Sequence, residues 1–252
     1  MLAPPTQVRP RLIVVLALLA LAATLLVRLP ARWGLALAPA GVGCDQPSGS
    51  VWSGGCRGLH VAGLTVESAT WQLHPLALLR LRLGMDLQVD DARVAGHASV
   101  AWSAGGRIEA RDLQAHLPID PGFLPLFPRG WGGTLLLALD ELQLVDGKPG
   151  AVRGSVHASA LHRFAPPMDF GDYALRFAQP PDANGRQLGQ LSDEGGPLSL
   201  SGQLQFGADG QYELNGLVAT RPEATPELAQ DLQILGPADA EGRRPFSLAG
   251  SF

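Results

Sequence analysis

The sequence contains few lysines, tyrosines and cysteines. It also lacks the short motifs that mark several classes of enzyme. Lys148 is the only lysine among 252 residues, and no serine stands three positions before it, which rules out a Ser-x-x-Lys catalytic pair. A Gly-x-Ser-x-Gly turn and a glycine-rich phosphate-binding loop are also missing from the sequence. We therefore expect a protein that is not an enzyme and that uses no cofactor.

The acidic and histidine residues do not form a catalytic or metal-binding pattern. Acidic residues are adjacent at 90–91, 140–141 and 193–194, where neighbours on a strand would point to opposite faces, so we predict solvated acids at turns. The six histidines are scattered along the chain, and His157 and His162 fall on opposite faces of any one strand. The sequence therefore predicts surface histidines and no metal site.

Positive charge is scarce beyond the first 32 residues. Four of the 19 basic residues precede residue 33, which leaves 15 basic against 23 acidic residues, a net charge of −8 for the remainder. A surface of this sign repels nucleic acid and does not dock on anionic lipid headgroups by charge alone. We expect no nucleic-acid partner.

One long apolar run is present, and it lies near the start of the sequence. The segment from Leu12 to Val27 contains a single polar residue, and as a helix it would extend about 24 Å. Arg11 and Arg28 can snorkel to the interfaces, which fits this length to a hydrocarbon core of about 30 Å. The run predicts a single-pass transmembrane helix with the N-terminus on the cytoplasmic side.

A cleaved signal peptide is the alternative interpretation of this run. Two arginines precede it, and small residues at 36–38 and 38–40 resemble a cleavage site. The run is long for a signal peptide, however, and two arginines and a tryptophan separate it from the small residues. We therefore favour a retained anchor. The predicted layout is a cytoplasmic tail at 1–11, a transmembrane helix at 12–29, a linker at 30–43 and an exported β domain at 44–252.

Cys44 and Cys56 are the only cysteines. An even count in an exported segment indicates a disulfide, and closing this loop contributes about 3 kcal/mol in the loop-entropy description. A zinc site would need more ligands, and His60 has no histidine partner at zinc-finger spacing. A lipidated Cys44 would have to follow the apolar run closely, which it does not. We predict a disulfide, with two free thiols as the alternative.

Beyond residue 57 the dominant hydrophobic period is two, which is typical of strands. Apolar and polar residues alternate at 80–89, 93–102, 151–160 and 198–206, and glycine-rich turns separate the runs. The alternation changes phase near residues 111–112, where a bulge would return both halves to one face. Strands with one apolar face predict a mainly β fold, a curved antiparallel sheet with one wet side.

Several segments depart from this alternation. In residues 134–145 both the odd- and the even-numbered positions carry apolar side chains, so we predict a strand that is central or covered on both faces. The one soluble helix is predicted at 223–235, with Thr225 as its N-cap and Pro226 first. Residues 120–130 and 180–196 are predicted to be irregular. We expect Trp33 at the membrane interface and the other four tryptophans mostly in the core.

Three stretches resemble the type II secretion system protein N family. GSVWSG at 49–54 is similar to a G-T-hydrophobic-W-S-G signature, and WQLHPLALL at 71–79 is similar to a W-x-L-x-P-x-x-L-L run. The C-terminal residues 232–250 resemble the family's final helix, polar turn and last strand. The residues that carry the resemblance are Gly49, Val51, Trp52, Ser53, Gly54, Trp71, Pro75, Gly236, Gly242 and Gly250.

The resemblance implies a structural component of a secretion machine in the bacterial inner membrane, with most of the chain in the periplasm. It implies other inner-membrane secretion proteins as partners, and the outer-membrane secretin as a further candidate. The family is also similar to larger AsmA-type proteins, whose curved sheets enclose an apolar groove. A lipid-binding or lipid-transfer module is therefore the alternative function.

Overall fold

The computed structural model describes residues 24, 28–35, 41–61, 64–103, 105–120 and 129–251. The predicted membrane segment at 12–29 lies outside the described residues, apart from Thr24, Arg28 and Leu29. Within these described ranges, no helix has the length and apolar character needed to cross a bilayer.

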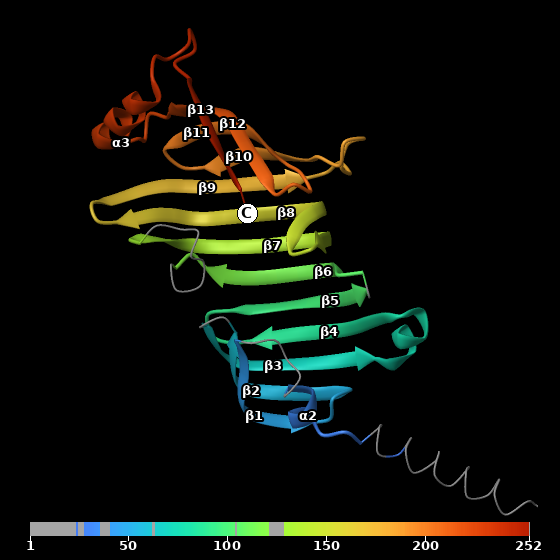
Figure 1. The fold of residues 1–252 in the computed structure, drawn as a ribbon. Helices are drawn as coiled ribbons and strands as arrows, with labels where there is room; N and C mark the ends of the chain where they lie inside the picture. The colour runs from blue at the N-terminus through green and yellow to red at the C-terminus, as the bar shows by residue number, and fades with distance from the viewer. Residues whose placement is uncertain are drawn as a thin grey trace, which may run out of the picture.

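The described strands form one antiparallel sheet, in which each strand pairs with its neighbours in sequence (Figure 1). This open meander confirms the mainly β, antiparallel part of the predicted fold class. The strands are β1 (Val42–Gly49), β2 (Ser53–Val61), β3 (Leu64–His74), β4 (Arg82–Asp90), β5 (Ala95–Ser103), β6 (Arg107–Pro118), β7 (Trp131–Val145), β8 (Lys148–Phe164), β9 (Pro167–Phe177), β10 (Gln187–Gly195), β11 (Leu198–Phe206), β12 (Gln211–Thr220) and β13 (Arg244–Ser251).

The predicted alternation places apolar side chains on one face of the sheet. Trp71 of β3 pairs with Leu87 of β4, which pairs with Ala98 of β5, so these three side chains share a face. The predicted bulge is present in β6, where Asp112 has φ +49°. Pairing with β5 shifts by one residue there, so the apolar residues before and after it face the same side.

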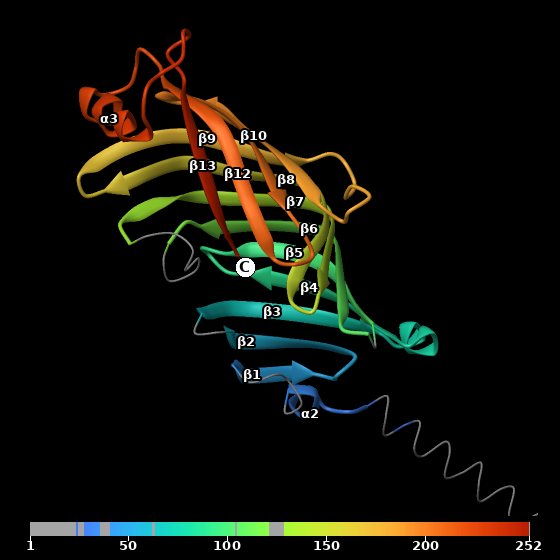
Figure 2. The same cartoon turned by 45° about the horizontal axis from the view of Figure 1, so that its top comes forward.

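The sheet curls at its C-terminal end, so that β11 and β12 face β7–β9 (Figure 2). A core cluster of Leu139, Val152, Phe177 and Phe206 fills the inside of this curl. A second cluster contains Met168, Leu198, Val218 and Leu228, and the last of these belongs to a helix. The curl therefore buries the apolar face of β7–β12 mainly against itself, with that helix covering one end.

That helix is α3 (Pro226–Asp231), followed by the 3₁₀-helix η2 (Leu232–Leu235). The Thr225 hydroxyl accepts a hydrogen bond from the Leu228 N–H at 3.3 Å, and Pro226 is first, as predicted. The predicted helix over 223–235 was too long. Its second half is the tighter η2, in which Leu235 is 38% exposed.

One prediction about strands needs correction, and another is confirmed in one of its two alternatives. Residues 180–196 were predicted to be irregular, yet they contain β10, a strand whose polar sequence QLGQLSDEG hides the alternation. The segment at 134–145 lies in β7, a central strand, which confirms the first of the two alternatives predicted for it. The second alternative does not apply, because Leu136 is 44% exposed on the polar face. The predicted irregular loop at 120–130 lies largely outside the described residues.

Two of the three acidic pairs lie in strands, and the prediction of turn acids was wrong for them. Asp140 and Glu141 belong to β7, and Arg153 of β8 pairs with both. Asp193 and Glu194 belong to β10, where their partners are described below. Ion pairs satisfy these acids within the strands β7 and β10, so neither pair of acids needs a turn.

Two short helices flank the N-terminal strands. The helix α2 (Ala31–Leu35) lies within the segment predicted as a linker, and Trp33 on it is 61% exposed. The 3₁₀-helix η1 (Pro75–Arg80) connects β3 to β4 and begins at Pro75, which has no N–H to leave unpaired. Of the other tryptophans, Trp102 is 53% exposed, so its predicted core position was wrong.

Candidate functional site: the β1–β2 hairpin and the two faces of the sheet

The GSVWSG stretch forms the turn between β1 and β2. Gly49 adopts φ +79°, and the Ser50 N–H donates to the Ser53 carbonyl at 2.9 Å, which closes a tight turn. The Val51 N–H donates to the Leu29 carbonyl at 2.9 Å. The turn is therefore bonded directly to the residue that ends the predicted membrane segment.

The residues just after Leu29 also contact this turn. Pro30 forms an isolated antiparallel bridge with Ser50. In α2, Gly34 lies so close to Val51 that an added Cβ would come within 3.1 Å of its Cγ2 atom. The hairpin turn and the segment that enters the domain thus form one packed unit.

The second of the stretches that resemble the family, residues 71–79, packs on the first, residues 49–54. The Trp71 indole N–H donates to the Val51 carbonyl at 3.0 Å, and the Leu73 N–H donates to the Trp52 carbonyl at 2.7 Å. Gly54 lies beneath the indole, where a Cβ would come within 2.6 Å of the ring. The two stretches are separate in the sequence, and the structure brings them together.

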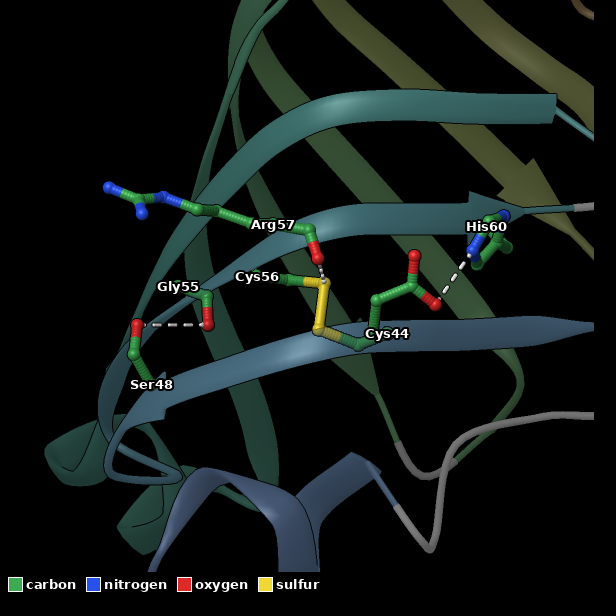
Figure 3. Close-up of a disulfide and its surroundings, with 7 residues drawn as sticks. Cys44, Ser48, Gly55, Cys56, Arg57 and His60 are labelled. Carbon is green, nitrogen blue, oxygen red and sulfur yellow. Dashed lines mark hydrogen bonds and ion pairs between the residues drawn. A yellow bond between two sulfur atoms is a disulfide. The ribbon is translucent and has the colours of Figure 1, made fainter.

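The predicted disulfide is present and joins β1 to β2 (Figure 3). The Cα atoms of Cys44 and Cys56 are 5.8 Å apart, and Cys56 is 2% exposed. Beside the disulfide, His60 lies between Asp45 and Thr65, with 3.0 Å to each partner. These contacts connect β1, β2 and β3 at the edge of the sheet that adjoins α2.

The third family stretch lies at the opposite end of the sheet, around β13 (Figure 1). Gly236 and Gly242 have φ +100° and +79°, which fits turns where an L side chain would be strained. Gly250 lies under the Tyr212 ring, and a Cβ there would come within 2.6 Å of the hydroxyl oxygen. The structure does not bring this stretch near the first two.

The apolar face of β4–β6 is less covered than that of β7–β9. Leu83 and Trp102 pair across β4 and β5 and are 40% and 53% exposed. A hollow of about 160 Å³ lies on this region, with Leu87, Leu113 and Leu117 in its lining. A shallow apolar surface therefore extends from the curl toward the N-terminal strands.

The opposite face carries pairs of histidine and carboxylate that the sequence pattern did not predict. Asp86 accepts a hydrogen bond from the Ser99 hydroxyl at 2.7 Å and lies 2.8 Å from the His74 ring nitrogen. The hydrogen bond from Ser99, followed by the contacts with His74, lowers the pKa of Asp86 below its ordinary value. The residues come from β3, β4 and β5, so only the strand register could have revealed them.

A second such group lies on β8, β9 and β10. Glu194 contacts His157 at 2.8 Å and Arg176 at 2.5 Å. The hydrogen bond with His157, aided by Arg176, lowers the pKa of Glu194. Asp193, its neighbour, is paired with Arg221. Both carboxylates thus form bonds to side chains outside their own strand, which helps to fix the relative positions of the strands.

Tyr173 is the described side chain whose pKa rises furthest. Burial, reinforced by nearby Asp193, raises the pKa of Tyr173 to about 12. Its hydroxyl donates to the Phe170 carbonyl at 2.5 Å. Tyr173 therefore stays protonated near neutral pH and acts as a structural donor. Among the described residues no group of three or more histidine, cysteine or acidic side chains could hold a metal ion.

Comparison with known proteins identifies the family of this chain. A relative from Aeromonas hydrophila, described as "Type II secretion system protein N", is 28% identical over 253 residues, covering 95% of this chain and 97% of its own length. No solved structure matches the chain. The family model described as "Type II secretion system (T2SS), protein N" matches residues 40–247, which contain all of β1–β12. The chain therefore belongs to the type II secretion system protein N family.

Proposed function

We propose that this protein is a non-enzymatic component of a bacterial type II secretion machine, anchored in the inner membrane by residues 12–29. Its sheet would lie in the periplasm and contact other secretion proteins. The observation that carries the proposal is the family match over 40–247. Two further features support it: the apolar run in the sequence and a disulfide, which is typical of oxidising compartments.

The hairpin contacts support a mechanical role for the first family stretch. Leu29 and Pro30 adjoin the proposed membrane helix, and both bond to the β1–β2 turn. Trp71 and the disulfide hold that turn on the sheet. A domain attached in this way keeps a defined orientation to its anchor, which a flexible linker would not provide.

Gene deletion followed by a secretion assay tests this function. We expect exported type II substrates to accumulate in the periplasm of the deletion strain, and release to return when the wild-type gene is supplied. A periplasmic protein that does not use this pathway serves as the control for cell lysis. Unchanged release of every type II substrate from the deletion strain would contradict the proposal.

The proposed location has its own test. A C-terminal alkaline phosphatase fusion should be active, because this enzyme folds in the oxidising periplasm. The full-length protein should remain in the membrane fraction after alkaline carbonate washing, with its N-terminal residues still present by mass spectrometry. An inactive fusion, or a soluble product cleaved after residue 38 or 40, would overturn the anchored topology.

Lipid handling is the second candidate function, and the exposed apolar face of β4–β6 favours it. Leu83 and Trp102 are the exposed pair on this face, and the hollow lined by Leu87 and Leu113 lies four residues further along the same strands. Mass spectrometry of the purified protein should then detect bound phospholipid. A Trp102→Glu variant should lose this lipid, whereas Leu76→Glu, at an exposed position on η1, should retain it. Absence of lipid from the wild-type protein would exclude this candidate.

A further inference from the structure

The two edges of the sheet differ in how they are protected. β1 carries Asp45 and Pro47, and both residues discourage the addition of another strand. The helix α2 also lies against β1, and the Pro30–Ser50 bridge joins the preceding segment to the turn at its end. This edge of the sheet therefore has the usual defences against pairing with another chain.

The opposite edge, β13, lacks these defences along most of its length. Its residues 246–251, FSLAGS, contain no charge and no proline. Among the described strands β13 pairs with β12 alone, and the η2 connection folds back only near its start, where the Arg244 guanidinium donates to the Gly236 carbonyl. Alternate N–H and C=O groups of β13 therefore point away from the sheet, free to pair with another strand.

The apolar side chains of β13 continue the core onto this edge. Phe246 packs against the cluster that contains Val218 and Leu228. Leu248 pairs with Leu214 on the same face but is 55% exposed. An added strand would cover Leu248 and extend the apolar face by one row.

We propose that β13 pairs with β13 of a second copy of this chain, antiparallel and with Leu248 on the two-fold axis. In this register Leu248 of one copy lies opposite Leu248 of the other, and Phe246 of each copy lies opposite the small Gly250 of the other. On the other face Ser247 meets Ala249. No like charges oppose each other, since residues 246–251 are uncharged, and the largest side chain, Phe246, faces glycine. The one pair of large side chains is Leu248 with its counterpart, which meet as an apolar contact on the axis.

The choice of a second copy follows from this self-complementarity. A two-fold interface requires that one patch fit itself, and an uncharged strand with a central exposed leucine satisfies that requirement. The head-to-tail alternative would join β13 to β1 of the next copy. α2 and Pro47 disfavour this arrangement, so pairing stops at two copies and does not continue as a fibre.

Cysteine cross-linking of the full-length protein in detergent tests the register. Leu248→Cys places two Cα atoms about 4.5 to 5.5 Å apart across the axis, a separation that a disulfide can bridge. We expect a covalent dimer under mild oxidation. The matched control is Leu76→Cys, since Leu76 is 76% exposed on η1 and lies away from the edge, and it should give no dimer.

A charge variant tests whether the pairing drives association. Leu248→Lys would bring two ammonium groups together on the axis, so the dimer dissociation constant measured by sedimentation should rise by at least roughly tenfold. Leu76→Lys should leave it unchanged, and circular dichroism should show that both variants are folded. A monomeric wild-type protein, an unaffected dimer in Leu248→Lys, or cross-linking of the Leu248→Cys variant in cells to a different protein would overturn the proposal.

Discussion

Trp71 connects two parts of the chain that are separated by 20 residues. Its indole N–H satisfies the Val51 carbonyl in the β1–β2 turn, and its ring covers Gly54. Removing the donor from this part-buried carbonyl costs more free energy than the hydrogen bond contributed. The reason is that the carbonyl oxygen would then lack both its protein partner and full contact with water.

We expect Trp71→Phe to lower the free energy of unfolding by about 1 to 3 kcal/mol, since the Val51 carbonyl would lose its donor and the ring would be smaller. Urea unfolding followed by circular dichroism measures this change. Trp102→Phe is the matched control, because Trp102 is 53% exposed, and its effect should stay within about 0.5 kcal/mol. Equal effects of the two variants would contradict this role.

Asp86 is a second residue whose state depends on one neighbour. Ser99→Ala removes the first cause of its lowered pKa, so we expect the pKa of Asp86 to rise toward the ordinary value of 3.8. Carboxyl-carbon NMR during an acid titration measures it. Ser68→Ala is the control, because the Ser68 hydroxyl donates to the Asp90 backbone carbonyl and does not touch Asp86.

The direction of this shift determines its effect on stability. The pKa of Asp86 is lower in the folded than in the unfolded state, so its contribution is complete above about pH 3.8 and is lost as the pH falls toward the folded value. Asp86 is 48% exposed, and solvent screening keeps the contribution small. As the pH falls below 3.8, the difference in stability between the wild-type protein and Ser99→Ala that comes from this carboxyl should therefore shrink.

At the scale of elements, the β1–β2 hairpin is held by several kinds of contact. The disulfide, the Asp45–His60–Thr65 contacts and the Pro30–Ser50 bridge all converge on it. An edge strand is otherwise the first to fray, because it has a partner on one side only. These contacts compensate for the missing neighbour.

Replacing both Cys44 and Cys56 by alanine should destabilise the protein by about 3 kcal/mol, the contribution expected for a closed loop of this length. Hydrogen exchange should show the largest loss of protection in β1 and β2. Dithiothreitol should lower the melting temperature of the wild-type protein and leave that of the double variant unchanged. A reductant-insensitive wild-type protein would mean that the two sulfurs are not joined.

The strands that the sequence predicted are those whose apolar face is regular. β11 matches its predicted range because Leu198, Leu200, Leu204 and Phe206 alternate with serines and glutamines, with Gly202 as the one break in the pattern. β10 was missed because Gln187 lies at a buried position, where its side-chain amide accepts from the Val152 N–H and donates to the Gln179 carbonyl. The pattern of polar and apolar residues cannot show that a polar side chain is buried and hydrogen-bonded to backbone groups far away in the sequence.

The candidate site was predictable in its parts and not in its assembly. The cysteine count and spacing predicted the disulfide, and the family stretches marked Val51 and Trp71. Their contact depends on the order β1–β2–β3 and on the position of Leu29, which only the folded chain provides. The histidine pairs were missed for the same reason, since His157 and Glu194 are 37 residues apart.

At the scale of the whole molecule, the curl of β10–β13 replaces a covering layer of helices. Phe177 of β9 and Phe206 of β11 meet edge to face at 6.0 Å inside it. The backbone hydrogen bonds of the sheet join these strands only in sequence. Apolar contact across the curl, together with side-chain bonds such as that between Val152 and Gln187, therefore keeps the C-terminal strands against β7–β9.

We expect Phe177→Ala to destabilise the protein by about 3 to 5 kcal/mol, since it leaves a cavity between the two sides of the curl. Chemical denaturation measures the loss, and hydrogen exchange should show β10–β13 opening before β2–β6. Phe164→Ala is the control, because Phe164 is 62% exposed at the end of β8. Uniform loss of protection in all strands would indicate that the curl does not act as a separate unit.

The strictly sequential strand order also determines how the chain can form its structure during synthesis. Each strand from β2 onward hydrogen-bonds to the strand made immediately before it, so its template already exists when it leaves the ribosome or a translocation pore. Such local connections require only short loops to close, which favours fast formation. The nascent sheet can therefore grow row by row from its cross-linked first hairpin, and the curl closes only after the last rows have been added.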